Sequence, residues 1–483
     1  MKAYKVTIFI FSIIACLAAI AAVFPEEGIT AGEITLNFPT LNEFTAGQQV
    51  AEEPQLTPEE LLAIRAQQMR QEQEEGFLSF FRENEAAIHF PTSDSAYHYL
   101  DPLFAALDGA DTTLVRIVHY GDSQIEEDRI SNMLRRRLQE QFGGQGVGIV
   151  PLYQSVQSQT IGQTCSYEPT RYSVFWLSTF RRKGSKLYGP MGQLSAINDN
   201  INLSIVPRTK VTGLYCAHYF NTITLITAPE NSITASLKGK KQTIKPNGSN
   251  LQFTEFQLPD STTTVSISLS GAGDVYGIMM TGKTGVNVDN MPMRGCSGTI
   301  FSGIDAQQLK AYFAYTNTRL IIMQFGGNSM PYLKTQKAID NYAATIGEQV
   351  RYMQRQAPQA QILFIGPSDM TTRIQGKMQT YTWLEDVDNA LMNEVTSAGA
   401  AYWSLFKAMG GKGAMAQWVR SGLAGSDYIH FTRKGASEVG NMLNNALMTG
   451  YDYYKWRQRE FAPLQEALPQ VNTLSIDSIS TTK

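Results

Sequence analysis

The sequence of 483 residues is poor in the side chains that bind metals. It contains only four cysteines and five histidines. None of them has the closely spaced pairs that are typical of a zinc site. The sequence therefore predicts no metal centre.

Charged side chains are also sparse, and neither sign dominates. They make up 17% of the chain, and the net charge is -3. A protein that binds nucleic acid normally presents a basic surface to the phosphates. We therefore expect no nucleic-acid partner.

Hydrophobic residues make up 43% of the chain, so disorder is not expected for most of it. Its length is enough for about two or three domains.

The few cysteines leave the question of a disulfide open. Cys16 lies in the N-terminal apolar run, which leaves Cys165, Cys216 and Cys296. Outside the cytosol Cys165 and Cys216 could pair, because both fall in one region of the chain. The alternative is that all three are buried thiols.

The N-terminus has the pattern of an export signal. Lys2 and Lys5 precede an apolar run over residues 6–24, and a short basic start before an apolar segment directs export. The run is a cleaved signal, with a small-residue site at 19–21, or a retained anchor with its positive end in the cytoplasm. Both interpretations place the bulk of the protein in the periplasm or cell envelope, possibly anchored to the inner membrane.

Apolar strands alternate with helical patterns in two parts of the chain. We expect strands at 114–120, 319–325, 361–366 and 400–405, and helices at 124–142 and 336–356. This alternation is typical of an α/β domain with a mainly parallel sheet that is covered on both faces.

The stretch between these two parts has a different pattern. It is rich in Ser, Thr, Asn and Gly, and apolar residues occur at every second position, as in Val265, Ile267 and Leu269. A period of two between Gly and Asn-Gly turns indicates antiparallel strands. We therefore expect an all-β sandwich inserted into the α/β domain.

The predicted domain organisation follows from these patterns. The segments are a signal peptide or anchor (1–24), a linker and lead-in helix (25–85), a discontinuous α/β domain (86–158 and 281–465), the β insert (159–280) and a polar tail (466–483).

The first candidate for chemistry is Ser123, in a Gly121-Asp122-Ser123 sequence at the junction of a predicted strand and helix. Ligands of open α/β folds bind at this edge, and a helix N-terminus favours a developing negative charge. Asp122 can hold the turn through backbone hydrogen bonds. The alternative is that Ser123 only caps the helix.

A serine nucleophile needs a base, and His430 is the best placed of the five histidines. It follows Asp427 by three residues, in a loop after the last predicted strand. Asp427 can accept the Nδ1 proton of the imidazole and leave Nε2 for the serine. His119 lies within a predicted strand, so we expect it in the core.

Two further segments offer hydrogen-bond donors for an oxyanion. Gly326 and Asn328 follow the strand at 319–325, and an Asn amide at this edge can stabilise negative charge. Gly295, with Gly298 as a rival, lies in the loop after the insert, where its backbone N–H could complete the hole.

In their order and placement, these four segments resemble the four motif blocks of the SGNH/GDSL hydrolases. The resemblance covers residues 110–155 and 285–450. It implies a three-layer α/β/α domain without a metal or cofactor. It implies Ser123, Asp427 and His430 as the catalytic triad, and an oxyanion hole from Ser123, Gly295 and Asn328.

A narrower resemblance links residues 119–153 to the bacterial peptidoglycan O-acetylesterases of this family, which also carry an inserted β module. Gln124 and Ser329 depart from residues that are usual in the family. The expected function is a serine esterase that removes acetyl groups from an envelope glycan. A glycan O-acetyltransferase with the same triad and a non-catalytic glycan-binding protein are the alternatives.

Overall fold

In the computed structural model, the structure describes residues 3–25, 28–31, 34–40, 57–92, 96–175, 180–208, 219–248 and 251–467. The chain divides into two compact units, Met1–Glu75 and Gly76–Lys483. The predicted bounds of the catalytic domain and the insert stay predictions. Residues 41–56 of the expected linker and nearly all of the polar tail lie outside the described residues.

The N-terminal unit contains one helix that is apolar and long enough to cross a membrane, among the residues that the structure describes. This helix is α1 (Ala3–Val23), with a span of 20 residues from Tyr4 to Val23. A short antiparallel hairpin, β1 (Ile29–Ala31) with β2 (Ile34–Leu36), lies where the sequence predicted a linker. Helix α3 (Pro58–Glu83) coincides with the predicted lead-in helix.

The larger unit is organised around a six-stranded sheet. Its order is β16 (Gly285–Pro292), β4 (Leu114–Gly121), β17 (Thr318–Gln324), β18 (Gln361–Ile365), β21 (Ala401–Trp403) and β3 (Ile88–His89). All neighbours are parallel except β21 and β3. The predicted parallel α/β sheet is confirmed, and β16 is a strand that the sequence patterns did not identify.

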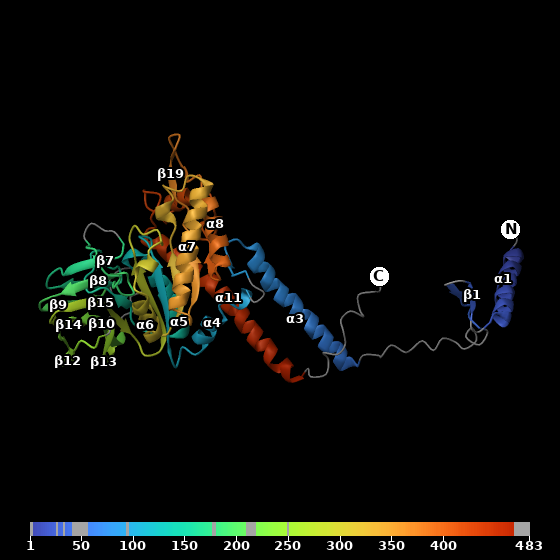
Figure 1. Ribbon diagram of the computed structural model, residues 1–483, viewed down its shortest axis with the longest axis horizontal. Coiled ribbons are helices and arrows are strands. Elements are labelled where there is room, and N and C mark those ends of the chain that lie inside the picture. The colour runs from blue at the N-terminus through green and yellow to red at the C-terminus, as the bar shows by residue number, and fades with distance from the viewer. Residues whose placement is uncertain are drawn as a thin grey trace. The chain divides into compact units, whose positions relative to one another are not determined.

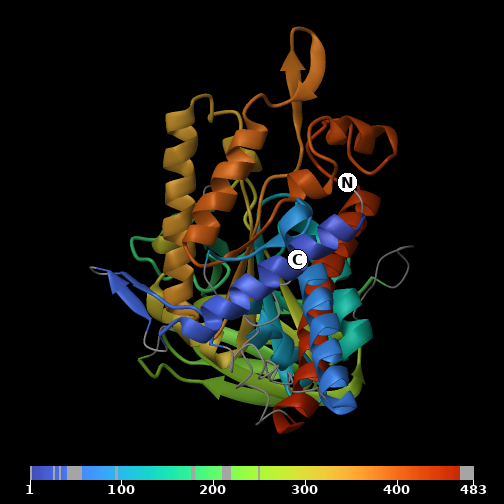
Figure 2. The same cartoon turned by 90° about the vertical axis from the view of Figure 1, so that its right-hand side faces the viewer.

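Both faces of this sheet are buried against helices, which explains why its strands are continuous apolar runs. One apolar cluster contains Val118 and Tyr120 of β4, and the other contains Val115 and Ile117. The first packs against α6 (Ala306–Tyr315), α7 (Gln336–Gln356) and α8 (Leu384–Ser397). The second packs against α4 (Asp101–Asp108), α5 (Arg129–Phe142) and α11 (Arg433–Ala467). Figures 1 and 2 show α7 beside α8 on one side of the sheet.

Helix α5 begins later than its apolar pattern predicted. Glu127 and Asp128 both have φ of +63°, so the segment Glu126–Asp128 forms a separate short turn before α5 starts at Arg129. Helix α7, in contrast, has the predicted bounds. A residue with positive φ interrupts the helical backbone but leaves the spacing of apolar residues unchanged. The apolar period alone therefore could not locate this boundary.

Two antiparallel sheets share a separate apolar cluster that includes Leu203, Ile223, Val265 and Ile267. The first sheet has the order β13 (Gln252–Thr262), β10 (Phe220–Pro229), β15 (Gly273–Thr281), β8 (Gln193–Ile197) and β7 (Thr170–Ser173), with β5 (Gly148–Val150) also paired to β15. The second has the order β12 (Lys240–Ile244), β11 (Ile233–Leu237), β14 (Val265–Ser270), β9 (Ile201–Pro207) and β6 (Ile161–Cys165). Figure 1 shows these strands grouped on one side of the larger unit.

The expected Cys165–Cys216 pair is not tested here, because Cys216 lies outside the described residues. The Cys165 thiol contacts the carbonyl oxygen of Leu152 at 3.0 Å.

Smaller elements follow strands β18 and β21 in the chain. The hairpin β19 (Thr371–Ile374) with β20 (Lys377–Thr380) projects from the body in both views (Figures 1 and 2). Helices α9 (Leu405–Ala408) and α10 (Ala414–Arg420) lie between β21 and α11 in the chain.

A buried carboxylate joins the parallel sheet to the antiparallel strand β5. Asp289 on β16 is fully buried and accepts two hydrogen bonds from Arg116 Nη1, at 2.7 and 2.8 Å. It also accepts from the Tyr312 hydroxyl at 2.5 Å and the Ile149 N–H at 3.0 Å. Gly148 passes so close that a Cβ there would lie 2.2 Å from Asp289 Oδ1. This position therefore requires a glycine.

Candidate active site

The strand register brings separate segments of the chain to one edge of the sheet. Gly121 at the end of β4 lies beside Pro292 on β16 and Gln324 on β17. Because these strands are parallel, the loops that follow them meet at their carboxyl ends. This edge therefore holds Ser123 from the loop after β4 and Asn328 from the loop after β17.

Ser123 and His430 are 307 positions apart in the chain and lie in hydrogen-bond contact. The distance from Ser123 Oγ to His430 Nε2 is 2.9 Å. Such a contact is the geometry in which an imidazole can take the hydroxyl proton of serine.

Asp427 fixes the orientation of His430. Its Oδ2 lies 2.7 Å from His430 Nδ1, and its Oδ1 accepts the backbone N–H groups of Ile429 and His430, both at 3.1 Å. Partial burial alone would raise the pKa of Asp427, but these hydrogen bonds outweigh it and lower the pKa. Asp427 is therefore a carboxylate that holds a proton on Nδ1 and leaves Nε2 to accept the serine proton.

The other described histidines have different surroundings. His119 is fully buried between Gln324 and Ser131, and burial lowers its pKa to about 4. It is therefore a neutral core residue. His98 pairs with Asp101, whereas His218 lies outside the described residues.

Asp122 and Asn328 hold each other at the sheet edge. Asn328 Nδ2 donates to Asp122 Oδ2 at 2.9 Å and to the Cys296 carbonyl at 3.1 Å. Asp122 Oδ1 accepts the Gln124 N–H at 2.9 Å, which fixes the turn after the strand as expected. Burial raises the pKa of Asp122 to about 6. Since both protons of the Asn328 amide have partners, its oxyanion role stays a prediction.

The two candidate glycines for the oxyanion hole lie in different surroundings from Gly327. Gly327 lines the hollow beside Ser123, whereas neither Gly295 nor Gly298 is among its lining residues. Gly298 packs on Phe325, which a Cβ would approach to 2.8 Å. Gly326 has φ of +130° and a Cβ there would lie 2.9 Å from Pro367, so it needs the freedom of glycine. The role of Gly295 stays a prediction, and Gly327 is a glycine of the hollow that the motif did not suggest.

The hollow at this edge has a volume of about 290 Å³ and contains Ser123 and His430 among its lining residues. Two tyrosines, Tyr332 and Tyr381, also line it. Tyr332 is 79% exposed. An exposed aromatic face beside a nucleophile offers a flat apolar surface on which a ring-shaped substrate can rest.

Two residues that the motifs did not identify tie the His430 loop to the Ser123 turn. Gln124 Nε2 donates to the Ile429 carbonyl at 2.7 Å. Arg129 donates to the carbonyl of Ser123 at 2.6 Å, to that of Glu126 at 3.0 Å and to that of Phe431 at 3.2 Å. These bonds hold the backbone on both sides of His430. The signal available in the sequence was the polar Gln124 immediately after the serine.

Across the described ranges, no group of three or more His, Cys, Asp or Glu side chains is arranged to hold a metal ion.

Comparison with protein-family models and with curated proteins finds no match. Among solved structures, the chain is similar to one described as "Peptidoglycan O-acetylesterase in action", with a TM-score of 0.62 and 20% identity over 76% of this chain and 99% of that chain. It also matches a family two carbohydrate esterase from Cellvibrio japonicus, with a TM-score of 0.24, 12% identity and coverage of 61% of this chain and 99% of that one. The likeness to the first structure concerns the fold alone, and the SGNH/GDSL assignment rests on the motifs.

Proposed function

We propose that the protein is a serine esterase that removes O-acetyl groups from a cell-envelope glycan, with peptidoglycan as the expected polymer. The observation that carries this proposal is the connected series Ser123 Oγ, His430 and Asp427, with contacts of 2.9 and 2.7 Å. A serine, a base and a carboxylate joined by hydrogen bonds in this order perform acyl transfer in unrelated folds.

The first half of the reaction forms an acyl-enzyme. His430 Nε2 takes the hydroxyl proton of Ser123 while Oγ attacks the acetyl carbonyl carbon, and Asp427 stabilises the resulting imidazolium. His430 then gives the proton to the sugar oxygen as the C–O bond of the ester breaks. The acetyl group stays on Ser123 and the sugar leaves with a free hydroxyl group.

The second half repeats the same steps with water. His430 takes a proton from water, the hydroxide attacks the acetyl carbon, and acetate leaves as Ser123 recovers its proton. In both halves the oxyanion is stabilised by the Ser123 N–H together with donors from Gly295 and Asn328. Gly327 is a further donor for this role, because it lines the hollow that holds Ser123.

Three observations favour a glycan as the leaving group. The fold is similar to that of a peptidoglycan O-acetylesterase. Exposed Tyr332 beside the nucleophile suits a sugar ring. The chain also has two antiparallel sheets, which we interpret as a carbohydrate-module-like insert.

The location that we propose is the periplasm or cell envelope. Helix α1 provides an export signal or an anchor in the inner membrane.

Acetate release tests the proposal directly. The full chain should release acetate from O-acetylated peptidoglycan, and Ser123→Ala should abolish the release while leaving the folded structure unchanged. Acetate release that survives Ser123→Ala would falsify the proposed nucleophile. Transfer of acetyl groups to glycan oligomers without release of acetate would instead identify an acetyltransferase.

A further inference from the structure

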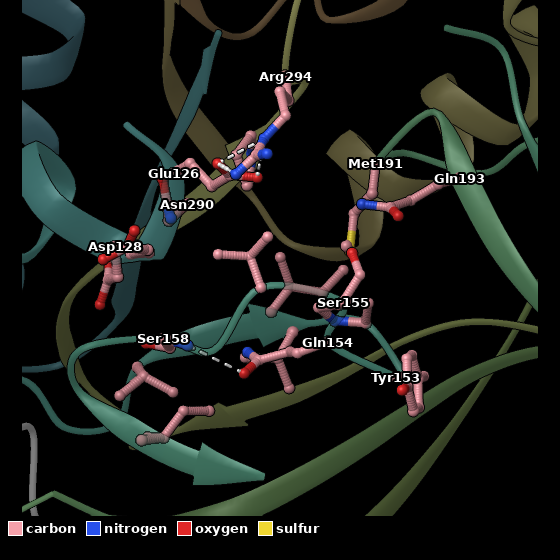
Figure 3. A pocket seen from close by; sticks show the side chains of 18 of the residues that line it. Glu126, Asp128, Tyr153, Gln154, Ser155, Ser158, Met191, Gln193, Asn290 and Arg294 are labelled. Carbon is pink, nitrogen blue, oxygen red and sulfur yellow. Dashed lines mark hydrogen bonds and ion pairs between the residues drawn. The ribbon is translucent and has the colours of Figure 1, made fainter. Parts of the chain in front are cut away.

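A second hollow lies beside the turn that follows Ser123, and nothing in the proposed reaction uses it (Figure 3). The turn contributes to both hollows. Asp122, Ser123 and Gln124 line the catalytic hollow, whereas residues 126–128 line the second one. A chain-like substrate bound at Ser123 therefore has a neighbouring recess formed by the same loop.

The floor of the second hollow is apolar. Ile149, Phe175 and Met191 line it and are at most 5% exposed. Their side chains come from β5 and from segments next to β7 and β8. An apolar floor of this kind favours a small hydrocarbon group such as a methyl.

The polar side chains above this floor carry amides rather than free charges. Gln154, Gln193 and Asn290 line the hollow. Figure 3 shows Gln193 and Asn290 on opposite sides of it, with Gln154 below. Amide groups can donate and accept, so they suit a neutral ligand that contains both kinds of hydrogen-bonding group.

These amides have hydrogen-bonding capacity that the protein does not use. Asn290 Oδ1 accepts from Ser131 at 3.0 Å, and Gln154 Oε1 accepts the Ser158 N–H at 3.3 Å. Within the described ranges, the Nδ2 of Asn290, the Nε2 of Gln154 and the whole amide of Gln193 have no protein partner.

Two of the three carboxylates that line the hollow form ion pairs, and the third accepts a hydrogen bond from a neutral amide. Glu126 forms hydrogen bonds with Arg294, at 2.8 Å between Oε2 and Nε. Asp128 is held by Arg135 at 2.8 and 2.9 Å. Glu127 accepts from Gln159 at 2.8 Å. Among the described lining residues Arg294 is the one cation, and it is paired with Glu126, so an anionic ligand would find no free counter-ion here.

We propose that the second hollow is a binding subsite for an N-acetylated sugar of the same glycan chain, with the acetamido methyl on the apolar floor and its amide among Gln154, Gln193 and Asn290. This inference rests on the proposed function, which supplies the glycan that carries the sugar. The hollow has a volume of about 80 Å³. That volume holds several water-sized groups, which is enough for an acetamido group while the ring stays at the rim.

The first test measures binding without catalysis. The full-length Ser123→Ala chain is titrated with an N-acetylglucosamine trisaccharide and with a glucose trisaccharide of the same linkage. We expect the N-acetylated sugar to bind more tightly, and Gln193→Ala to weaken its binding about fivefold, the effect of one lost hydrogen bond. Equal affinity for the two sugars, or an unchanged affinity after Gln193→Ala, would overturn the subsite.

A matched control and a blocking variant complete the design. Gln242→Ala removes the same side chain from β12, where Gln242 lines neither hollow and contacts the Glu255 carbonyl. This control should leave binding unchanged. Ser155 is exposed and lines the second hollow, so Ser155→Phe should obstruct it and weaken trisaccharide binding as Gln193→Ala does.

Kinetics separate this inference from the proposed function. In the chain with an intact Ser123, Gln193→Ala should raise the KM for O-acetylated peptidoglycan about fivefold. Hydrolysis of a small acetyl ester, which cannot reach the second hollow, should stay the same. If no ester is cleaved but the N-acetylated trisaccharide still binds, the proposed function fails and the subsite stands. A variant that loses both activities equally would count against the subsite.

Discussion

At the scale of single residues, the loop that carries His430 is held by hydrogen bonds within the loop itself. Asp427 accepts two backbone N–H groups with one oxygen and the His430 ring with the other. A spacing of three residues lets one carboxylate do both. The pair Asp427 and His430 could therefore be predicted from the sequence, and the contact with Ser123 was the part that needed the fold.

The substitution Asn328→Ala tests whether this residue stabilises the oxyanion or only holds the structure of the site. If its amide stabilises the oxyanion, Asn328→Ala should lower kcat about 100-fold to 1000-fold, the usual effect of one lost donor. Acetate release from a small acetyl ester measures this effect.

The control for Asn328 is Asn341→Ala, which removes an exposed amide on α7. The loss of one oxyanion donor should lower kcat about 100-fold. If kcat falls less than about threefold in Asn328→Ala, Asn328 does not stabilise the oxyanion and only holds Asp122 in place.

Arg129 is a positioning residue in our interpretation, because it bonds carbonyl groups on both sides of the Ser123–His430 contact. Arg129→Lys keeps the charge but cannot reach three carbonyl oxygens with a planar fork. We expect kcat to fall roughly 10-fold to 100-fold, as small misplacements of reacting groups do, while KM for a small ester stays nearly constant.

Arg136→Lys is the matched control for Arg129, since Arg136 lies on the same helix and pairs with Glu140 on the surface. A kcat in Arg129→Lys that equals that of the control would refute the positioning role.

At the scale of elements, buried hydrogen bonds join helix α8 to strand β21 and the residue that follows it. Asp388 on α8 accepts from the Tyr402 hydroxyl on β21 and from Ser404 Oγ, both at 2.6 Å. Burial raises the pKa of Asp388 to about 6. The strand was predicted at 400–405, but helix α8 and its link to the strand were not, because hydrogen bonds between separate elements leave no local period in the sequence.

The raised pKa of Asp388 sets the sign of a pH effect. In the unfolded chain an aspartate titrates near pH 4, so the folded state binds the proton more tightly. The stabilisation is complete below about pH 4 and is lost as the pH rises through about 6. Asp388→Asn imitates the protonated form, so it should gain stability relative to the unsubstituted chain from pH 4 to pH 7, by up to about 2–3 kcal/mol.

Urea unfolding at several pH values measures the Asp388 effect. Asp386→Asn, on the exposed face of the same helix, is the control. A stability difference between Asp388→Asn and the unsubstituted chain that is independent of pH would show that this carboxyl does not titrate in the interval.

At the scale of the whole molecule, Asp289 connects the parallel sheet, α6 and β5 through one buried carboxylate. Asp289→Ala would leave the buried Arg116 guanidinium without its counter-ion. We expect a loss of about 3–5 kcal/mol in the free energy of unfolding, measured by urea unfolding.

Replacing both charges distinguishes lost pairing from lost packing. Arg116→Met combined with Asp289→Leu should recover part of the loss, because no unpaired charge stays buried. A double variant that is less stable than Asp289→Ala would contradict the assignment to an uncompensated charge.

The sequence by itself determined the alternation of strands and helices, the run of period-two strands and the four polar motifs. These are local patterns, because apolar period and residue spacing report which face of an element is buried. The Asp427–His430 spacing belongs to the same kind of information.

Only the tertiary structure decided which residues meet. The packing of distant segments placed Ser123 2.9 Å from His430, gave Asn328 two protein acceptors and put Gly327, rather than Gly295, in the hollow beside Ser123. It also formed the second hollow from β5 and the turn after Ser123. Such contacts depend on how distant segments pack across a sheet edge, and no local period in the sequence encodes that packing.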